Sequence, residues 1–506
     1  MSDAVQPALQ YVDEHREQFL EELKDLIRIP SISTLPKHRK DMRRAARFVA
    51  DQLTAIGLRK VRLIKTAGHP LVYGEWLDAP GKPTALLYGH YDVQPVDPLA
   101  LWESPPFEPT IRGDNLYARG AVDDKGQMFA IVKALEALMR TGGTLPLNVR
   151  VLIEGEEEAG GESIEHYVVE HPERLGCDVA LIVDTGIPAP DVPSITYGVR
   201  GIIYAEIEAR GAKRDLHSGE FGGIAPNAIH ALAVVLAGLK DARGHIHIPG
   251  LYDKMRPATE EERRMWARNP ADMPAIWKRE MGLDVLPGEP EYDPIERNCA
   301  RPTFEVHGII GGFTGDGAKT VIPAEVRAKV SLRLVPDQRP KAVFKLLERR
   351  VQELCPPGVT MTVTEIHGGD AVVVPLDNVY IRAAERAVEQ EWGKAPVFER
   401  SGGSIPIGAL FDRVLGVPVV FLGAGLPDDN IHAPNEKFHL PYFYRDIRQI
   451  LRFLHLVGND PAIAARPNVS AQRRGTTRRA STASSADGAN GAAASRRVRT
   501  PAGKKA

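Results

Sequence analysis

Short apolar runs that alternate with helix-patterned segments restrict the fold of this chain more than any other feature. Residues 84–88, 149–154 and 179–183 have the length and composition of buried parallel strands. Between the first two runs, residues 126–142 have a helical pattern that stops at a glycine. This order predicts an α/β fold in which helices flank a mostly parallel sheet.

The middle of the chain follows another pattern. Residues 202–210 and 325–334 alternate apolar and polar side chains, which is typical of half-exposed strands, and helical segments lie between them. From about residue 378 the α/β pattern returns. We therefore expect a discontinuous first domain, residues 1–200 and 371–465, interrupted by an inserted α+β domain, residues 201–370.

The charge is unevenly distributed along the 506 residues. The formal net charge is −2, yet residues 466–506 alone contain ten Lys/Arg and one Asp, so the preceding body is acidic. An acidic body argues against nucleic acid as the main partner. The basic segment has almost no large apolar side chains, and we expect a disordered basic tail.

The location of the protein is also suggested by composition. No run of eighteen apolar residues is present, and the acidic N-terminal segment lacks the apolar core of a secretory signal. Cys177, Cys299 and Cys355 are far apart and have no CxxC spacing. We expect reduced thiols, no membrane contact and a cytoplasmic protein.

Polar side chains follow the predicted strands at the points where they end. His90 and Asp92 come directly after the first strand. Further candidates at later strand ends are Asp123, Asp124, Glu154, Glu156, Glu157, Glu158, Asp184 and His432. Ligands of open α/β sheets bind at the carboxyl edge, where all these clusters are expected.

Each cluster alone has an ordinary structural explanation. The pair Asp123–Asp124 could cap the helix that follows it, and a run of three glutamates is usually a solvated surface. Together, carboxylates so crowded would repel one another unless cations neutralise them. Two histidines among several carboxylates suit zinc, cobalt or manganese, and the set is large enough for two ions that share a carboxylate.

The same residues resemble a known family. The segments GHYDVQP (residues 89–95), YARGAVDDKG (117–126), EGEEEAGGES (154–163) and VDTG (183–186) are similar to those of the di-metal exopeptidases. That family includes carnosine-type dipeptidases, aminoacylase, carboxypeptidase G and succinyl-diaminopimelate desuccinylase. The dipeptidase branch is nearest, and the similarity extends over residues 9–460 in order. It implies that the inserted domain is a lid that also forms the dimer interface.

The resemblance implies roles for individual residues. The expected metal ligands are His90 and Asp184 on one ion, Glu158 and His432 on the other, and Asp123 between them. Glu157 would be the general base, and Asp92 would orient His90 through its second ring nitrogen. The peptide bond between Asp123 and Asp124 is expected to be cis.

The resemblance also implies substrate contacts in the inserted domain and near residues 399–408. His217 would reach the active site of a partner chain and stabilise the oxyanion, and Arg333 would bind the terminal carboxylate of the substrate. Thr320, Ser404 and His367 are further candidate contacts. Taken singly, His217 would be a surface histidine and Arg333 an exposed strand cation. Carnosine-type dipeptidases carry Glu where this chain has Ser401, which weakens the case for binding a substrate amino group there.

The sequence therefore predicts a cytoplasmic, homodimeric hydrolase that cleaves the amide bond of dipeptides with water activated by two metal ions. Zinc is expected, with manganese or cobalt as alternatives. A deacylase of N-acyl amino acids is the alternative activity within the family, and a non-catalytic binding protein on the same fold is the alternative outside it. A magnesium-dependent phosphoryl-transfer enzyme would have little use for two histidine ligands.

Overall fold

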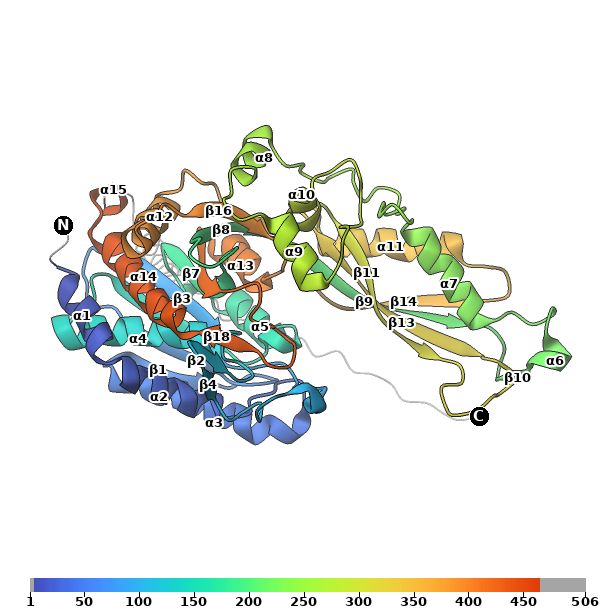
Figure 1. Ribbon diagram of the computed structural model, residues 1–506, viewed down its shortest axis with the longest axis horizontal. Helices are drawn as coiled ribbons and strands as arrows, with labels where there is room; N and C mark the ends of the chain where they lie inside the picture. The colour runs from blue at the N-terminus through green and yellow to red at the C-terminus, as the bar shows by residue number, and fades with distance from the viewer. Residues whose placement is uncertain (1–3, 465–506) are drawn as a thin grey trace, which may run out of the picture.

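A mixed nine-stranded sheet organises one lobe of the computed structural model, which describes residues 4–464 (Figure 1). Its strands lie in the order β1 (Arg59–Ile64), β2 (Leu71–Trp76), β6 (Asn148–Glu154), β3 (Thr84–His90), β7 (Val179–Gly186), β17 (Val419–Gly425), β8 (Ser194–Val199) and β15 (Val372–Val373), with β16 (Val397–Ser401) beside β8. Pairing is parallel through β6, β3, β7 and β17, and the edge strands β1, β2 and β15 are antiparallel.

The central parallel strands are the apolar runs expected from the sequence, and the α/β class is confirmed. Every residue of β3 is buried, because helices cover both faces of a parallel sheet. Leu87 pairs with Val151 of β6 on one side and with Leu181 of β7 on the other. The carboxyl ends of the three strands therefore meet at one edge, where β3 ends on His90.

Helices enclose this sheet. They are α1 (Gln6–Glu14), α2 (Arg16–Ile27), α3 (Arg39–Ala55), α4 (Lys125–Gly142), α5 (Glu162–Glu170), α12 (Val379–Trp392), α13 (Pro406–Leu410), α14 (Leu440–Asn459) and α15 (Pro461–Ala464). Helix α4 is almost completely buried and packs against β3, β7 and α14. It stops at Gly143, whose φ of 65° lies in the left-handed region that glycine adopts without steric cost. A small sheet of β4 (Thr110–Arg112), β5 (Asn115–Tyr117) and β18 (Lys437–His439) lies beside it.

The second lobe is built on a four-stranded antiparallel sheet. Its order is β11 (Thr303–Gly311), β13 (Glu325–Leu334), β9 (Gly201–Arg210) and β14 (Thr360–Gly369). Helices α7 (Ala228–Leu239) and α11 (Pro340–Leu354) cover one face and enclose a separate apolar core. The alternation predicted for β9 is present, since Ile203, Ala205 and Ile207 are buried between more exposed neighbours.

The tip of this lobe lies far from the first lobe (Figure 1). It consists of the strand pair β10 (Leu216–His217) and β12 (Val321–Ile322) with the short helix α6 (Ser218–Phe221). Helices α8 (Glu260–Trp266), α9 (Met273–Met281) and α10 (Pro294–Cys299) lie nearer the junction of the lobes (Figure 1).

The expected basic tail, residues 466–506, lies outside the described residues. Among residues 4–464, no helix is both long enough and apolar enough to cross a membrane. Cys177, Cys299 and Cys355 are all free thiols.

Candidate metal centre

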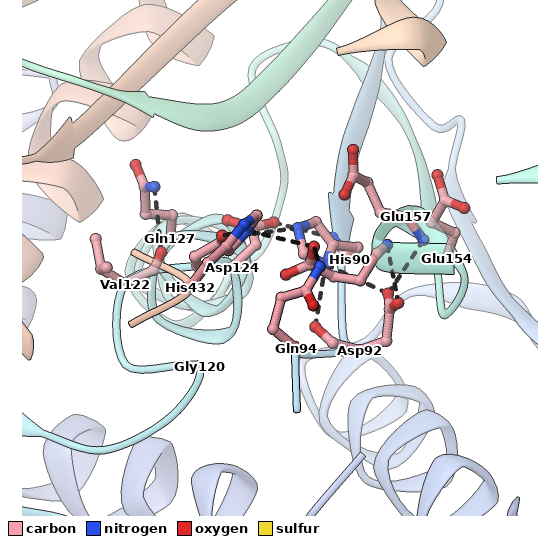
Figure 2. Close-up of polar contacts among 12 residues, drawn as sticks. His90, Asp92, Gln94, Gly120, Val122, Asp124, Gln127, Glu154, Glu157 and His432 are labelled. Carbon is pink, nitrogen blue, oxygen red and sulfur yellow. Dashed lines mark hydrogen bonds and ion pairs between the residues drawn. The ribbon is translucent and has the colours of Figure 1, made fainter. Parts of the chain in front are cut away.

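The carboxyl edge of the first sheet brings the predicted ligands together in two adjoining groups. One group is His90, Asp124 and Asp184, and the other is Asp123, Glu158 and His432. Within each group the ligand atoms lie within 4.8 Å of one another. Figure 2 shows His90 and His432 directed toward the same small region, although they come from distant parts of the sequence.

Asp123 lies between the two histidines. Its Oδ1 is 3.3 Å from Nε2 of His90, and its Oδ2 is 2.9 Å from Nε2 of His432. Each oxygen of one carboxylate thus faces a different imidazole, the arrangement that a bridging ligand of two ions requires. The peptide bond from Asp123 to Asp124 is cis.

Helix capping and a solvated surface, the two structural explanations considered for these acids, do not account for the arrangement. Asp124 precedes helix α4, but its side chain forms no capping hydrogen bond with it. Its Oδ2 instead accepts a hydrogen bond of 2.9 Å from the backbone N–H of His90. Glu158 belongs to the run of three glutamates, yet its side chain is only 3% exposed. These carboxylates therefore point into the protein rather than toward solvent.

Asp92 fixes two parts of the site at once (Figure 2). It lies fully buried beside His90, with its Oδ1 3.3 Å from Nδ1 of that ring. Its two oxygens also accept hydrogen bonds from the backbone N–H groups of Glu157 and Glu158, at 3.3 and 3.1 Å. A carboxylate on the far nitrogen of a ligating histidine fixes the ring and its tautomer. The same carboxylate here also fixes the glutamate loop.

The electrostatics of the cluster reflect crowded acids. Burial raises the pKa of Asp184 to about 7, an effect that His90 opposes and the charge of Asp123 reinforces. Burial and the charge of Asp123 also raise the pKa of Glu158. Burial lowers the pKa of His432, but its contacts with Asp123 and Glu158 outweigh this and raise it to about 11. The cluster therefore favours bound positive charge.

Unpaired buried atoms indicate what form that charge takes. Nε2 of His90, Oδ1 of Asp124 and Oε1 of Glu158 are buried and accept or donate no hydrogen bond among the described residues. An unsatisfied buried polar atom is costly, and a coordinated cation removes that cost. Imidazole nitrogens and carboxylate oxygens without a thiolate suit zinc, manganese or cobalt. The residues present fit two divalent ions that share Asp123.

A cavity of about 770 Å³ adjoins this cluster and is lined by Glu157 and Glu158. Arg333, His367 and Ser404 line the same cavity, so the structure brings three of the four predicted substrate contacts next to the predicted base. Arg333 is on β13 and His367 on β14, so the second lobe forms one wall of the cavity.

The other two predicted residues of the second lobe are elsewhere. His217 is exposed at the tip, where its Nδ1 accepts a hydrogen bond of 3.0 Å from Gly219 N–H. Thr320 is beside it, because its carbonyl accepts a hydrogen bond from Ser218 N–H at 3.1 Å. The chain does not bring either residue to its own metal cluster.

Sequence reasoning missed Glu436. This fully buried carboxylate accepts hydrogen bonds from the backbone N–H groups of Gly120, Val122 and Asp123, and it pairs with Arg119 at 2.7 Å. It thereby shapes the loop that carries Asp123. Its position four residues after His432, in a segment already expected to carry a metal ligand, could have identified it.

Comparisons with known proteins agree with this site. The model of peptidase family M20/M25/M40 matches residues 86–456. A Cys-Gly metallodipeptidase of Candida albicans is 33% identical over 90% of this chain and 97% of its own length. The crystal structure of human carnosine dipeptidase 1 has a TM-score of 0.80 and 31% identity, covering 90% of this chain and 98% of its own. A metallo-carboxypeptidase from Sulfolobus solfataricus has a TM-score of 0.79 and 33% identity, covering 87% and 99%.

The family match spans more than half of the chain and includes the strand ends that carry the clustered histidines and acids. The alignments extend over nearly the entire length of each of these relatives, so both lobes are part of the similarity. The chain belongs to peptidase family M20/M25/M40.

Proposed function

We propose that the chain is a dinuclear metallodipeptidase that hydrolyses the amide bond of small peptides with a free carboxylate. The observation that carries this proposal is the position of Asp123 between His90 and His432, with Glu157 at the adjoining cavity. The names of the relatives, which describe Cys-Gly and carnosine dipeptidases, support the substrate class. Zinc is the proposed metal, with manganese or cobalt as alternatives.

The five proposed ligands are His90, Asp123, Glu158, Asp184 and His432. Asp124, which the sequence did not single out as a ligand, lies in the first group and holds the backbone of His90. Two bound divalent ions would supply the positive charge that polarises a scissile carbonyl and acidifies water.

Glu157 is the proposed general base. Its carboxylate accepts a proton from the attacking water and then donates it to the leaving amine, so the bond to nitrogen can break. Its backbone is held by Asp92, and its side chain faces the cavity. Burial raises its pKa well above the usual range, and two bound divalent ions would lower it again, so that the carboxylate could accept a proton.

Arg333 is the proposed ligand of the substrate carboxylate. It lines the cavity and forms no ion pair within residues 4–464, so its planar donor fork is available to a bound anion. Ser404 and His367 line the cavity near it and are proposed as further contacts.

We also propose a homodimer, because the second lobe has features that a partner chain would complete. Strand β11 is at the edge of its sheet, and its Ile309 and Ile310 are 58% and 73% exposed. Val234 of α7 is 55% exposed. An apolar edge strand that is left open favours association. In such a dimer, His217 and Thr320 would serve the site of the partner chain, with His217 on the oxyanion.

The chain organisation and location complete the proposal. Residues 1–200 and 371–465 are the proposed catalytic domain, and residues 201–370 the proposed lid and dimerisation domain. Three free thiols support a reducing compartment, and we propose the cytoplasm.

A second activity is favoured by one residue. Ser401, whose hydroxyl accepts a hydrogen bond of 3.0 Å from Gly403 N–H, stands beside the substrate loop where an acid would bind a substrate amino group. Without that charge, N-acyl amino acids or longer peptides are the alternative substrates, and a related structure is described as a carboxypeptidase.

The experiment is a substrate panel with zinc-, manganese- or cobalt-loaded protein. Dipeptides, the matching N-acetyl amino acids and tripeptides are compared by kcat/KM. The proposal expects dipeptides to be preferred. Preference for N-acetyl amino acids or tripeptides would assign the alternative activity, and no hydrolysis of any amide would contradict the proposal.

A further inference from the structure

Arg200 occupies the junction between the two lobes. Strand β8 of the first sheet ends at Val199, and strand β9 of the second sheet begins at Gly201. One residue therefore connects the sheets in the forward direction. The return connection is close, because a Cβ at Gly201 would be 2.6 Å from the carbonyl oxygen of Gly369. Arg200 is thus at the hinge about which the lobes meet.

The hinge is tied to the loop that carries Ser404. The Nε of Arg200 donates a hydrogen bond of 2.7 Å to the carbonyl of Gly402, and its backbone N–H donates one of 2.9 Å to Gly403. The hydroxyl of Ser404 donates in turn to the carbonyl of Gly201, at 3.1 Å. Three consecutive loop residues are therefore fixed to two consecutive hinge residues.

The guanidinium of Arg200 is also buried without a counterion. The residue is only 7% exposed, its Nη1 donates to the carbonyl of Arg301 at 3.2 Å, and it forms no ion pair within residues 4–464. Arg301, by contrast, pairs through two nitrogens with Glu289. Burying a charge is costly unless something compensates it, and carbonyl dipoles compensate it only in part.

A second cation without an ion pair among residues 4–464 lies on the neighbouring strand β13. Arg333 pairs with Ile202 of β9, which follows Arg200 by two residues in the chain. Ile202 and Arg333 both line the cavity. Burial and the charge of Arg333 lower the pKa of Arg200 to about 10, which leaves it protonated at neutral pH. Acids such as Glu157 line the same cavity, but neither Arg333 in its wall nor Arg200 behind it forms an ion pair within residues 4–464, so their positive charge favours a bound anion at this wall.

We propose that Arg200 is a positioning residue for the substrate carboxylate: it holds the loop Gly402–Ser404 against the hinge and adds its charge to that of Arg333. This inference rests on the proposed function. The loop, the hinge and Arg333 then move as one unit, so the carboxylate is bound only when the two lobes have the correct relative orientation. An uncharged substrate end gains little from this arrangement.

The test measures binding separately from turnover. In a metal-loaded Glu157→Gln background, isothermal titration compares a dipeptide with the same dipeptide carrying a C-terminal amide. Arg200→Met is expected to weaken binding of the free dipeptide about 10- to 100-fold, the worth of hydrogen bonds to a charged group, and binding of the amide less than about threefold. Arg200→Lys retains the charge but not the planar guanidinium. Its affinity for the free dipeptide is expected to lie between those of the wild type and Arg200→Met.

Arg301→Met is the matched control, because Arg301 is equally buried but pairs with Glu289 and does not contact the loop through its side chain. It is expected to leave the preference for free carboxylate over amide unchanged. Thermal unfolding of all variants separates loss of folding from loss of positioning. If Arg200→Met unfolds, the ratio of the affinities for the free dipeptide and its amide is measured for Arg200→Lys and Arg200→Gln instead, and that ratio decides the question.

In the active background, Arg200→Met should raise KM about tenfold or more and change kcat less than about threefold. Equal effects on dipeptide and amide, or no effect on either, would overturn the inference. A wild-type protein that hydrolyses no dipeptide would contradict the proposed function instead, and the binding ratio would still decide the role of Arg200.

Discussion

At the metal centre each functional side chain is held by buried partners, whereas at the tip of the second lobe the functional candidates stand in solvent. His90 is fully buried and contacts Asp92 and Asp123. The side chain of His217 is exposed, and among the described residues it accepts a hydrogen bond only from the nearby backbone N–H of Gly219. Yet both are histidines proposed for the same reaction.

The difference shows which parts of the proposed active site a single chain provides. The proposed ligands, including Asp123, and the proposed base Glu157 meet at one sheet edge, so a single chain provides the whole of the proposed metal centre. The tip has no cluster of this kind within the described residues. The lobe that carries the tip has an open edge strand, β11, which leaves room for another chain. We therefore expect the metal centre to tolerate changes in association and the tip to depend on them.

The largest effect is expected from Glu157→Gln. The amide keeps the size of the side chain but cannot accept the proton of water, so kcat should fall about 10²- to 10⁴-fold. Metal content, measured by elemental analysis, should remain that of the wild type. Glu162→Gln, an exposed neighbour at the start of α5, is the control and should stay within about twofold. Near wild-type turnover in Glu157→Gln would remove the proposed base.

His217→Ala tests whether the exposed tip takes part in the reaction as the metal centre does. If His217 stabilises the oxyanion, kcat should fall about 10²- to 10³-fold, with little change in metal content. Mixing this variant with Glu157→Gln tests which chain it serves. A mixed dimer would contain one site with both residues intact, so activity should recover to about a quarter of wild type after random exchange. Absence of any recovery in verified mixed dimers would contradict action between chains.

A smaller effect is expected from Asp92→Asn. The amide still has one oxygen for a hydrogen bond, but it lacks the charge that orients His90 and holds the glutamate loop. Metal affinity should weaken about 10- to 100-fold, as measured by competition with a chelator. Asp97→Asn, in the loop after β3, is the control. Unchanged affinity in Asp92→Asn would contradict its orienting role.

The smallest effect on the metal centre is expected from Ile310→Lys. A charge on the exposed edge strand should shift dimers toward monomers, seen by analytical ultracentrifugation, with unchanged metal content. Val169→Lys, at an exposed apolar position on the first lobe, is the control and should remain associated like the wild type. A fully dimeric Ile310→Lys protein would place the interface elsewhere.

The sequence predicted the first lobe well because local patterns determine it. Strands β3, β6 and β7 are buried on both faces, so each appears as a continuous apolar run, and the polar residue that follows each run is at the carboxyl edge. The pattern therefore located His90 and Asp184 at strand ends, and the resemblance to the di-metal exopeptidases supplied the roles of the individual ligands, including Asp123.

Other features depend on contacts that no local pattern encodes. Glu436 reaches the loop of Asp123 from more than three hundred positions along the chain, and Asp92 serves two partners at once. The separation of His217 from the cluster follows from the extended shape of the second lobe (Figure 1). The side chain of Arg200 joins its own segment to those of Gly402 and Arg301 at the hinge, and no sequence motif marks these contacts.

The proposed mechanism requires two ions that share Asp123. A crystal structure of the zinc-loaded protein with anomalous scattering tests this requirement most directly. We expect two zinc peaks on either side of the Asp123 carboxylate, one at His90 and the other at His432. A single peak that involves both histidines, or zinc bound away from Asp123, would contradict the account.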